Sequence, residues 1–326
     1  MKVLVSDTLS PVGLKVLEEE KGIVVDVKTG MTKEELCKEI RQYDGLIVRS
    51  GTKVTADVID AAKKLKAIAR AGVGVDNIDV DAATKRGIIV MNAPTGNTIS
   101  TAELSFSLLL ALSRNVPRAD RSLRGGKWER KRFVGAELYD KALGLIGMGR
   151  VGTEVAKRAQ AFGMHILAYD PLLTEARAKT LDVECCLLDD VIEKADYISL
   201  HAPLTPETHH MLGATEFARM KKGVRIVNCA RGGLVDEAAL AQAIKSGHVA
   251  GAALDVYEQE PPRDNPLFEL DEVVLTPHLG ASTSEAQQRV AVEAARQLVD
   301  ALKGGVVRNA VNMAPVDSAT LEVIKP

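Results

Sequence analysis

The sequence contains few aromatic residues, no excess of charge of one sign and no long apolar run. Aromatic residues make up 3% of its 326 residues, and 42 basic against 44 acidic side chains leave a net charge of −2. Nucleic-acid binding usually requires a basic surface and aromatic stacking, so we expect no nucleic-acid partner. No apolar run reaches the roughly 18 residues that a membrane helix needs, so we expect no membrane role.

Cysteine is also scarce, and its spacing argues against a metal site. The chain forms no CxxC pair and no metal-ligand spacing with histidine from its four cysteines, Cys37, Cys185, Cys186 and Cys229. Reduced thiols in a reducing compartment are the default for such a pattern. The N-terminus lacks the apolar stretch and cleavage site of a secretion signal, so we expect a cytoplasmic protein without a bound metal.

The sequence does contain one complete strand, turn, helix and strand between Lys141 and Asp170. An apolar stretch leads into Gly147, Gly149 and Gly152, and a helical pattern follows. Glycines at this spacing allow a tight turn and close approach of the backbone to a pyrophosphate, which the helix N-terminus attracts. Asp170 ends the second strand, 18 residues after Gly152, where a carboxylate accepts the ribose hydroxyls of NAD and repels the extra phosphate of NADP. The unit predicts NAD as cofactor, and the alternative is a glycine-rich turn that binds nothing.

Strands and helices alternate on both sides of this unit, and 326 residues exceed the size of a single core. We therefore predict an α/β fold of two doubly wound parallel-sheet domains. Residues 1–96 and 283–314 would form a discontinuous, flavodoxin-like substrate-binding domain, into which a Rossmann NAD-binding domain, 97–282, is inserted. Capping boxes at Ser100 with Glu103 and at Ser282 with Glu285 would begin two long helices, and 306–312 would return to the first domain as a short strand.

Three loops at predicted strand ends carry the groups that oxidation of a 2-hydroxy acid requires. Hydride transfer from the carbinol carbon needs a base for the hydroxyl proton, a partner for that base and a cation for the carboxylate. We assign these roles to His278, Glu260 and Arg231, and a carboxylate beside the imidazole would raise the pKa of the histidine. Each residue alone is more often structural, but the three together after a dinucleotide motif favour catalysis.

The strand ends of the predicted first domain carry two arginines beside glycine-rich backbone. Arg49 is followed by Ser50 and Gly51, and Arg70 is followed by Ala71 and the 72–74 loop. This combination suits a small anion that bears a carboxylate or a phosphate. An equally weighted alternative is that both arginines pair with nearby acids.

Other polar residues receive more modest predictions. His201 is expected to line the cofactor pocket through its backbone, and Asp255 either accepts a hydrogen bond from the nicotinamide amide or caps a strand end. Cys229 is expected to pack against a ring rather than act as a nucleophile. A basic run around Trp128 is expected to be a solvated or subunit-contacting loop. Ordinary loop or surface positions are expected for the remaining histidines, His165, His209, His210 and His248.

Nine stretches in order cover nearly the whole chain and resemble the D-isomer-specific 2-hydroxyacid dehydrogenases. They are GLIVRSGTKVT, RAGVGVDNID, GNTISTAE, GKWERKRF, GLIGMGRVG, HAPLTPET, NCARGGLVDE, GAALDVYEQEPP and PHLGAST. The resemblance implies an NAD-dependent enzyme that acts on a small phosphorylated 2-hydroxy acid, with Arg231, Glu260 and His278 as the catalytic set. The family also pairs through its cofactor domain, which implies a homodimer with the helix after Ser100 at the interface and leaves a higher oligomer open.

The resemblance also implies the ligand contacts. Cofactor contacts are expected at Gly147, Gly149, Arg150, Val151, Gly152, Asp170, Ala202, Pro203, Cys229, Ala230, Arg231, Asp255, His278 and Gly280. Substrate contacts are expected at Arg49, Ser50, Arg70, Gly72, Val73, Gly74, Asn97, Arg231 and His278.

Several alternatives stay open at this stage. Hydroxypyruvate or glyoxylate reductases and other members of the family share the catalytic set, and NAD-sensing transcriptional corepressors use the same fold. The second alternative is disfavoured because no extra peptide-binding extension is evident. Residues 315–326 resemble the start of an extension that many members carry, so the chain is either a natural short form or a truncated one, and feedback regulation through that extension is not implied.

Overall fold

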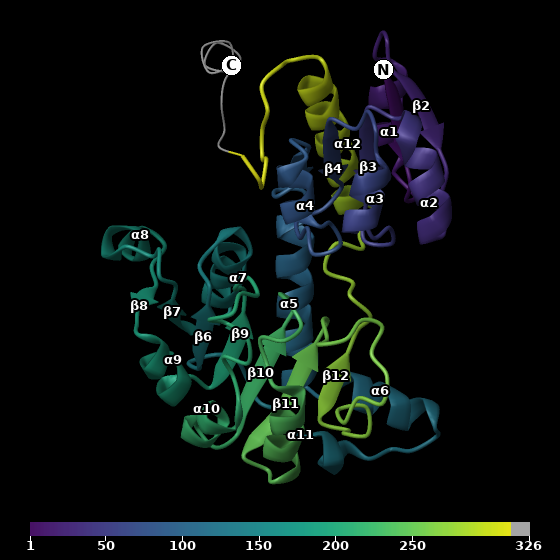
Figure 1. Cartoon of the computed structure of the whole chain (residues 1–326). Helices are drawn as coiled ribbons and strands as arrows, with labels where there is room; N and C mark the ends of the chain where they lie inside the picture. The colour runs from purple at the N-terminus through teal and green to yellow at the C-terminus, as the bar shows by residue number, and fades with distance from the viewer. Residues whose placement is uncertain (314–326) are drawn as a thin grey trace. The chain divides into compact units, whose positions relative to one another are not determined.

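The computed structural model describes residues 1–313, which divide into two compact units (Figure 1). Unit 1 comprises Met1–Asn97 and the described residues from Ala281 on, and unit 2 comprises Thr98–Gly280. The predicted tail, 315–326, lies outside the described residues. The predicted boundaries at 96 and 282 stay predictions of where the functional domains end.

Unit 1 is built on a five-stranded parallel sheet in the order β2-β1-β3-β4-β5. This is the flavodoxin-like order, as predicted. The strands are β1 (Lys2–Val5), β2 (Val24–Val27), β3 (Gly45–Val48), β4 (Ala67–Arg70) and β5 (Ile89–Asn92). The helices are α1 (Pro11–Glu18), α2 (Lys33–Glu39), α3 (Ala56–Ala61), α4 (Val80–Lys85) and α12 (Ser284–Leu302), with a 3₁₀ turn, η1, at Ile40–Gln42.

Alternation along the strands divides the core of unit 1 into two layers. Leu46 of β3 packs with α2, α3 and α4 on one face of the sheet, whereas its neighbour Ile47 packs with α1 and α12 on the other. Both side chains are buried, because successive residues of a strand point to opposite faces. Helix α4 was not predicted; it spans six residues and is capped by Asp79, whose side chain accepts a hydrogen bond from Ala82 N.

Two predictions about the end of unit 1 were wrong. Helix α12 is capped by Thr283, whose Oγ1 accepts a hydrogen bond from Ala286 N, rather than by Ser282. The 306–312 segment returns to unit 1 but makes one isolated bridge, between Met91 and Ala310, instead of a strand. Two main-chain hydrogen bonds join the segment to β5, Asn92 N to Asn309 O at 3.2 Å and Val311 N to Val90 O at 2.8 Å. Beyond them the side chain of Asn312 bonds the main chain of Ile88 and Val90, so the ladder ends there.

Unit 2 contains a seven-stranded parallel sheet in the order β12-β11-β10-β9-β6-β7-β8. The order reverses direction between β6 and β9, which is the Rossmann arrangement that the sequence predicted. The strands are β6 (Ala142–Ile146), β7 (His165–Tyr169), β8 (Glu184–Cys185), β9 (Tyr197–Leu200), β10 (Val224–Asn228), β11 (Val249–Leu254) and β12 (Val273–Leu275). The helices are α5 (Thr98–Ser113), α6 (Val116–Arg124), α7 (Arg150–Ala161), α8 (Glu175–Thr180), α9 (Leu188–Lys194), α10 (Ala214–Arg219) and α11 (Glu237–Lys245), with a 3₁₀ turn, η2, at Arg130–Phe133.

Helix α5 begins at Thr98, so the predicted capping box at Ser100 was wrong. Ser100 is buried, and its hydroxyl donates to Gly280 O at 2.8 Å instead of capping the helix. The helix packs against α7, β10 and β11. Within residues 1–313, no helix is both long and apolar enough to cross a bilayer.

The contact between α1 and α12 depends on Gly13. A Cβ at this position would lie 2.6 Å from Ala291 Cβ and 2.9 Å from the Ala291 carbonyl, which is helix backbone and cannot move alone. We expect Gly13→Val to lower the free energy of unfolding by about 2 kcal/mol or more, as overpacking does. Lys15→Val in the same helix is exposed and should change it by no more than about 0.5 kcal/mol. Urea unfolding of both variants tests this, and equal effects would contradict it.

Candidate active site

The glycine turn of unit 2 lies between β6 and α7. Gly147 has φ +101°, and a Cβ there would lie 2.6 Å from His201 O. A Cβ on Gly152 would lie 2.1 Å from Gly147 O, so helix and turn are in contact at this point. By contrast, a Cβ on Gly149 would meet nothing within 4 Å. The turn therefore needs glycine at 147 and 152 for its own packing, whereas Gly149 faces open space at the N-terminus of a helix, where a phosphate is favoured.

Asp170 follows β7 and is bonded to the glycine turn. Its Oδ2 accepts a hydrogen bond from Met148 N at 2.7 Å, and its Oδ1 accepts one from Leu172 N at 2.8 Å. The residue is partly exposed, so its carboxylate still has acceptor capacity toward solvent. The acid that the sequence assigns to the ribose thus lies beside the turn that it assigns to the pyrophosphate, and both fit a dinucleotide.

The loops after β9 and β10 carry further predicted cofactor contacts. Ala202 N lies 3.0 Å from a Cβ built on Gly147, so the 201–203 segment borders the glycine turn. His201 Nε2 lies 3.0 Å from Ser199 Oγ, and burial lowers the pKa of His201 to about 4, so the imidazole is neutral. Burial raises the pKa of Cys229 to about 12, which excludes a thiolate nucleophile at neutral pH.

His278 and Glu260 form a direct pair, as expected from the sequence. His278 Nδ1 lies 2.6 Å from Glu260 Oε2. Because an ionised carboxylate only accepts hydrogen bonds, Nδ1 carries a proton and Nε2 is the other ring nitrogen. The hydrogen bond raises the pKa of His278 above its usual value, although burial opposes this. Burial alone would raise the pKa of Glu260, but the bond to His278 and its charge outweigh this and lower it.

The backbone around His278 is held by Asp255. The carboxylate of Asp255 is fully buried and accepts hydrogen bonds from Thr276 Oγ1 at 2.6 Å, Leu279 N at 2.7 Å and Gly280 N at 2.8 Å. His278 itself has φ +54°, a conformation rare for residues other than glycine. These contacts correspond to the strand-end cap that the sequence left open for Asp255, and contact with the nicotinamide stays a prediction.

Arg231 lies on the loop after β10 and acts on both members of the pair. Asn228 Nδ2 donates to Arg231 O at 2.8 Å, and Arg231 Nη1 donates to Ala230 O at 2.7 Å, which fixes the loop. Its positive charge lowers the pKa of both Glu260 and His278. Unit 2 therefore brings a guanidinium, a carboxylate and an imidazole together from the loops after β10, β11 and β12.

The predicted substrate residues that belong to unit 1, apart from Asn97, lie at neighbouring strand ends. Val48 and Arg70 are register partners of β3 and β4, so Arg49 and Arg70 leave the same edge of the sheet. A Cβ on Gly72 would lie 1.8 Å from Arg70 Nη1, so the arginine side chain occupies the space that glycine leaves. The main-chain N–H of Arg49 donates to Asp7 at 2.6 Å, and within residues 1–313 its guanidinium forms no ion pair. Asn97 is the last residue of the first segment of unit 1, directly before α5.

Sequence reasoning missed one contact near this site. His210 was expected to be an ordinary loop residue, but its Nε2 lies 3.0 Å from Glu258 Oε1. The two residues are separated by 48 positions, and no spacing in the chain signals their contact.

Comparisons with known proteins agree with this geometry. The protein-family model of the D-isomer specific 2-hydroxyacid dehydrogenase, NAD binding domain, matches residues 106–280. The D-3-phosphoglycerate dehydrogenase of Methanocaldococcus jannaschii is 54% identical over 100% of this chain and 62% of its own length. The chain thus spans about 62% of that relative.

Solved structures are similar over nearly the whole chain. The TT0316 protein of Thermus thermophilus has a TM-score of 0.88 at 40% identity, covering 95% of this chain and 100% of its own. A D-lactate dehydrogenase of Aquifex aeolicus, solved with NAD and lactic acid, has a TM-score of 0.86 at 28% identity, covering 96% of this chain and 100% of its own. The family model that matches residues 106–280 is that of an NAD binding domain, so NAD is the cofactor of unit 2.

Substitutions at Gly149 and Gly152 should affect NAD binding and stability differently. We expect Gly149→Ala to lower NAD affinity at least about tenfold because its Cβ enters the space of the pyrophosphate. The same change should cost no more than about 1 kcal/mol of stability, since only the N-cap residue changes. Gly152→Ala should lower both affinity and stability, the latter by about 1 to 3 kcal/mol, because its Cβ meets the backbone. Calorimetric titration with NAD and urea unfolding test this, and normal NAD affinity of Gly149→Ala would contradict it.

Proposed function

The chain belongs to the D-isomer specific 2-hydroxyacid dehydrogenase family, and we propose that it oxidises D-3-phosphoglycerate to 3-phosphohydroxypyruvate with NAD. This reaction would begin the phosphorylated route to serine. One observation carries the proposal: His278 is paired with Glu260 at 2.6 Å, within the electrostatic reach of Arg231. The name of the relative that is 54% identical supports the choice of substrate.

In this proposal, His278 is the general base. Its Nδ1–H is held by Glu260, so Nε2 receives the proton of the substrate hydroxyl. An imidazolium cannot accept this proton, so oxidation becomes faster as the pH rises through the pKa of His278. Because Glu260 raises that pKa, the rise occurs at a higher pH than for an unpaired histidine. In the reverse direction the imidazolium donates the proton, and the pairing with Glu260 favours this protonated form of His278.

Arg231 holds the substrate carboxylate in this mechanism. A guanidinium offers two parallel N–H donors, which fix the plane of a carboxylate and therefore the orientation of the adjacent carbinol carbon. Gly232 is next in the chain, and a Cβ there would lie 1.7 Å from Tyr257 O, so the loop that carries Arg231 packs directly on the loop that carries Glu260. When bound at the glycine turn, NAD supplies the nicotinamide ring that accepts the hydride.

The residues of unit 1 support a phosphorylated substrate. Arg49 and Arg70 leave neighbouring strand ends, next to the glycine-rich 72–74 loop. Two guanidinium groups suit a phosphate dianion. An unphosphorylated hydroxy acid has only its carboxylate, which Arg231 would hold, and offers no anionic group to Arg49 and Arg70. We propose that these arginines, with Ser50, the 72–74 loop and Asn97, contact the substrate.

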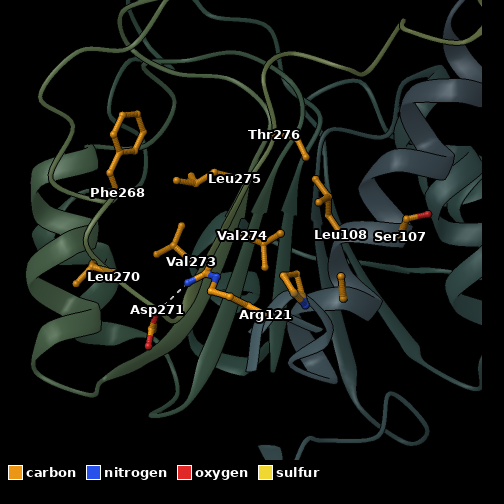
Figure 2. A pocket seen from close by; sticks show the side chains of 12 residues that line it. Ser107, Leu108, Arg121, Phe268, Leu270, Asp271, Val273, Val274, Leu275 and Thr276 are labelled. Carbon is orange, nitrogen blue, oxygen red and sulfur yellow. Dashed lines mark hydrogen bonds and ion pairs between the residues drawn. The ribbon is translucent and has the colours of Figure 1, made fainter. Parts of the chain in front are cut away.

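We also propose a homodimer formed through unit 2. A pocket of about 460 Å³ lies over the edge strand β12, between α5 and the 268–271 segment (Figure 2). Leu108 of α5 and Val274 of β12 line it, and Arg121 of α6 pairs with Asp271 at 3.4 Å at its margin. Large apolar side chains on α6 and the following loop are more than half exposed: Val116, Leu123, Trp128 and Val134. Such a concentration of exposed apolar surface favours a protein partner, and a second copy of the chain is the partner that the family implies.

The catalytic proposal is tested by nicotinamide absorbance with D-3-phosphoglycerate, D-glycerate and D-lactate. We expect the highest kcat/KM with D-3-phosphoglycerate, and we expect His278→Asn to lower kcat by about two orders of magnitude or more. His165→Asn, an exposed histidine paired with Asp140, is the control and should keep full activity. Preference for glyoxylate or hydroxypyruvate would indicate the reductase alternative, and NAD binding without any turnover would indicate a corepressor-like protein.

The dimer is tested by light scattering after gel filtration. We expect a mass of at least twice the 34.9 kDa of the chain, and we expect Leu123→Glu with Trp128→Glu to reduce it to that of the monomer, since two charges would be buried at the interface. Val24→Glu, at an exposed apolar residue of unit 1, is the control and should not alter the mass. A monomeric wild-type protein would contradict the proposal.

A further inference from the structure

A second group of ionisable side chains lies beside the catalytic loops of unit 2. His210 Nε2 is 3.0 Å from Glu258 Oε1, and His210 Nδ1 is 4.0 Å from Asp236 Oδ2. The ring of His209 stacks on that of His210, with centroids 3.9 Å apart. Glu258 precedes Glu260 by two residues on the same loop. The ring of His210 is thus held in position beside the segment that carries the partner of the proposed base.

The loop that carries Glu260 is held on both sides of that residue. On the N-terminal side, Glu258 N donates to Glu237 Oε1 at 2.8 Å, and Glu237 N donates to Glu258 Oε1 at 3.3 Å. On the C-terminal side, Asn265 Nδ2 donates to Glu237 Oε2 at 2.5 Å. Glu237 is the first residue of α11, so the start of one helix fixes both ends of the 258–265 segment.

His210 also fixes the loop that carries Arg231. Its main-chain N–H donates to Gly233 O at 2.7 Å, two residues after the arginine. Gly233 has φ +78°, and a Cβ there would lie 3.6 Å from His209 Cδ2, so this turn packs against the histidine pair. Through its main chain and its ring, His210 therefore connects the Arg231 loop to the Glu260 loop.

We propose that His210 and Glu258 are positioning residues, which hold the Arg231 and Glu260 loops together so that Glu260 stays bonded to His278. This inference rests on the proposed function, in which these three residues are catalytic. A role in global stability explains the pair less well, because its side chains are 36% and 40% exposed and exposed ion pairs contribute at most about 1 kcal/mol. The catalytic rate is more sensitive to this pair than the stability is, since a displacement of about 1 Å in a site can lower the rate a hundredfold.

The test compares Glu258→Ala and His210→Ala with the conservative Glu258→Gln, whose amide oxygen can still accept from His210 Nε2 and Glu237 N. NMR titration of ¹³C-labelled histidine measures the pKa of His278, assigned with His278→Asn, and steady-state kinetics measures kcat and KM. In both alanine variants we expect the pKa of His278 to fall toward its ordinary value and kcat to fall about ten- to a hundredfold. The KM for NAD should change less than about twofold because the glycine turn is not touched, and Glu258→Gln should restore most of both properties.

His165→Ala is the matched control, because it removes another histidine–carboxylate pair of 3.0 Å in the same unit. If the wild-type protein is active and Glu258→Ala changes neither the pKa of His278 nor kcat, the inference is overturned and the proposed function stays intact. A fall in that pKa in a protein that turns over no 2-hydroxy acid would support the inference and reject the proposed function. A loss of activity with an unmoved pKa, or an equal loss in His165→Ala, would also overturn it.

Discussion

The alignment of β10, β11 and β12 is the constraint on which the candidate site depends. These strands are neighbours in one parallel sheet, with Asn228 opposite Leu254 and Leu254 opposite Leu275. Parallel strands end at the same edge, so the three loops that follow begin beside one another although their key residues, Arg231, Glu260 and His278, are far apart in the chain. The sheet determines that these groups meet, and the loops determine how precisely they meet.

Within those loops, buried polar contacts replace the regular ladder of the sheet. Asp255 is the main example: a fully buried carboxylate holds the turn of His278 with three hydrogen bonds. A buried charge is costly unless it is well satisfied, and three donors at 2.6 to 2.8 Å satisfy it. The loops of Arg231 and Glu260 are held in a similar way by Asn228 and Glu237. The imidazole thus stays beside its carboxylate although both side chains are partly exposed.

Sequence patterns predicted most elements of unit 1 and the main strands of unit 2, but not helices α4, α6, α8, α9 and α10 or strand β8. The two parallel sheets and the strands β9 and β12 follow from strand–helix alternation, and the Rossmann character of unit 2 follows from the glycine turn. The missed helices span six to nine residues, which gives only a weak apolar period. At Ser282 the capping signal was one residue early, because the neighbouring hydroxyl of Thr283 caps α12. At Ser100 it was wrong, because the helix already begins at Thr98 and the Ser100 hydroxyl bonds Gly280 O. The 306–312 segment suggested a strand, and its main chain makes two hydrogen bonds to β5, but the side chain of Asn312 takes the next ones at Ile88 and Val90.

The sequence by itself determined the fold class, the glycine turn with Asp170 and the choice of imidazole, carboxylate and guanidinium, because these follow from local periodicity and from the chemistry of residue types. Only the tertiary structure decided that Asp255 supports the turn of His278 and that His210 reaches Glu258. Both contacts join residues more than 20 positions apart on different loops. Their formation depends on which strands become neighbours and on how each loop is held, and a local sequence pattern predicts neither.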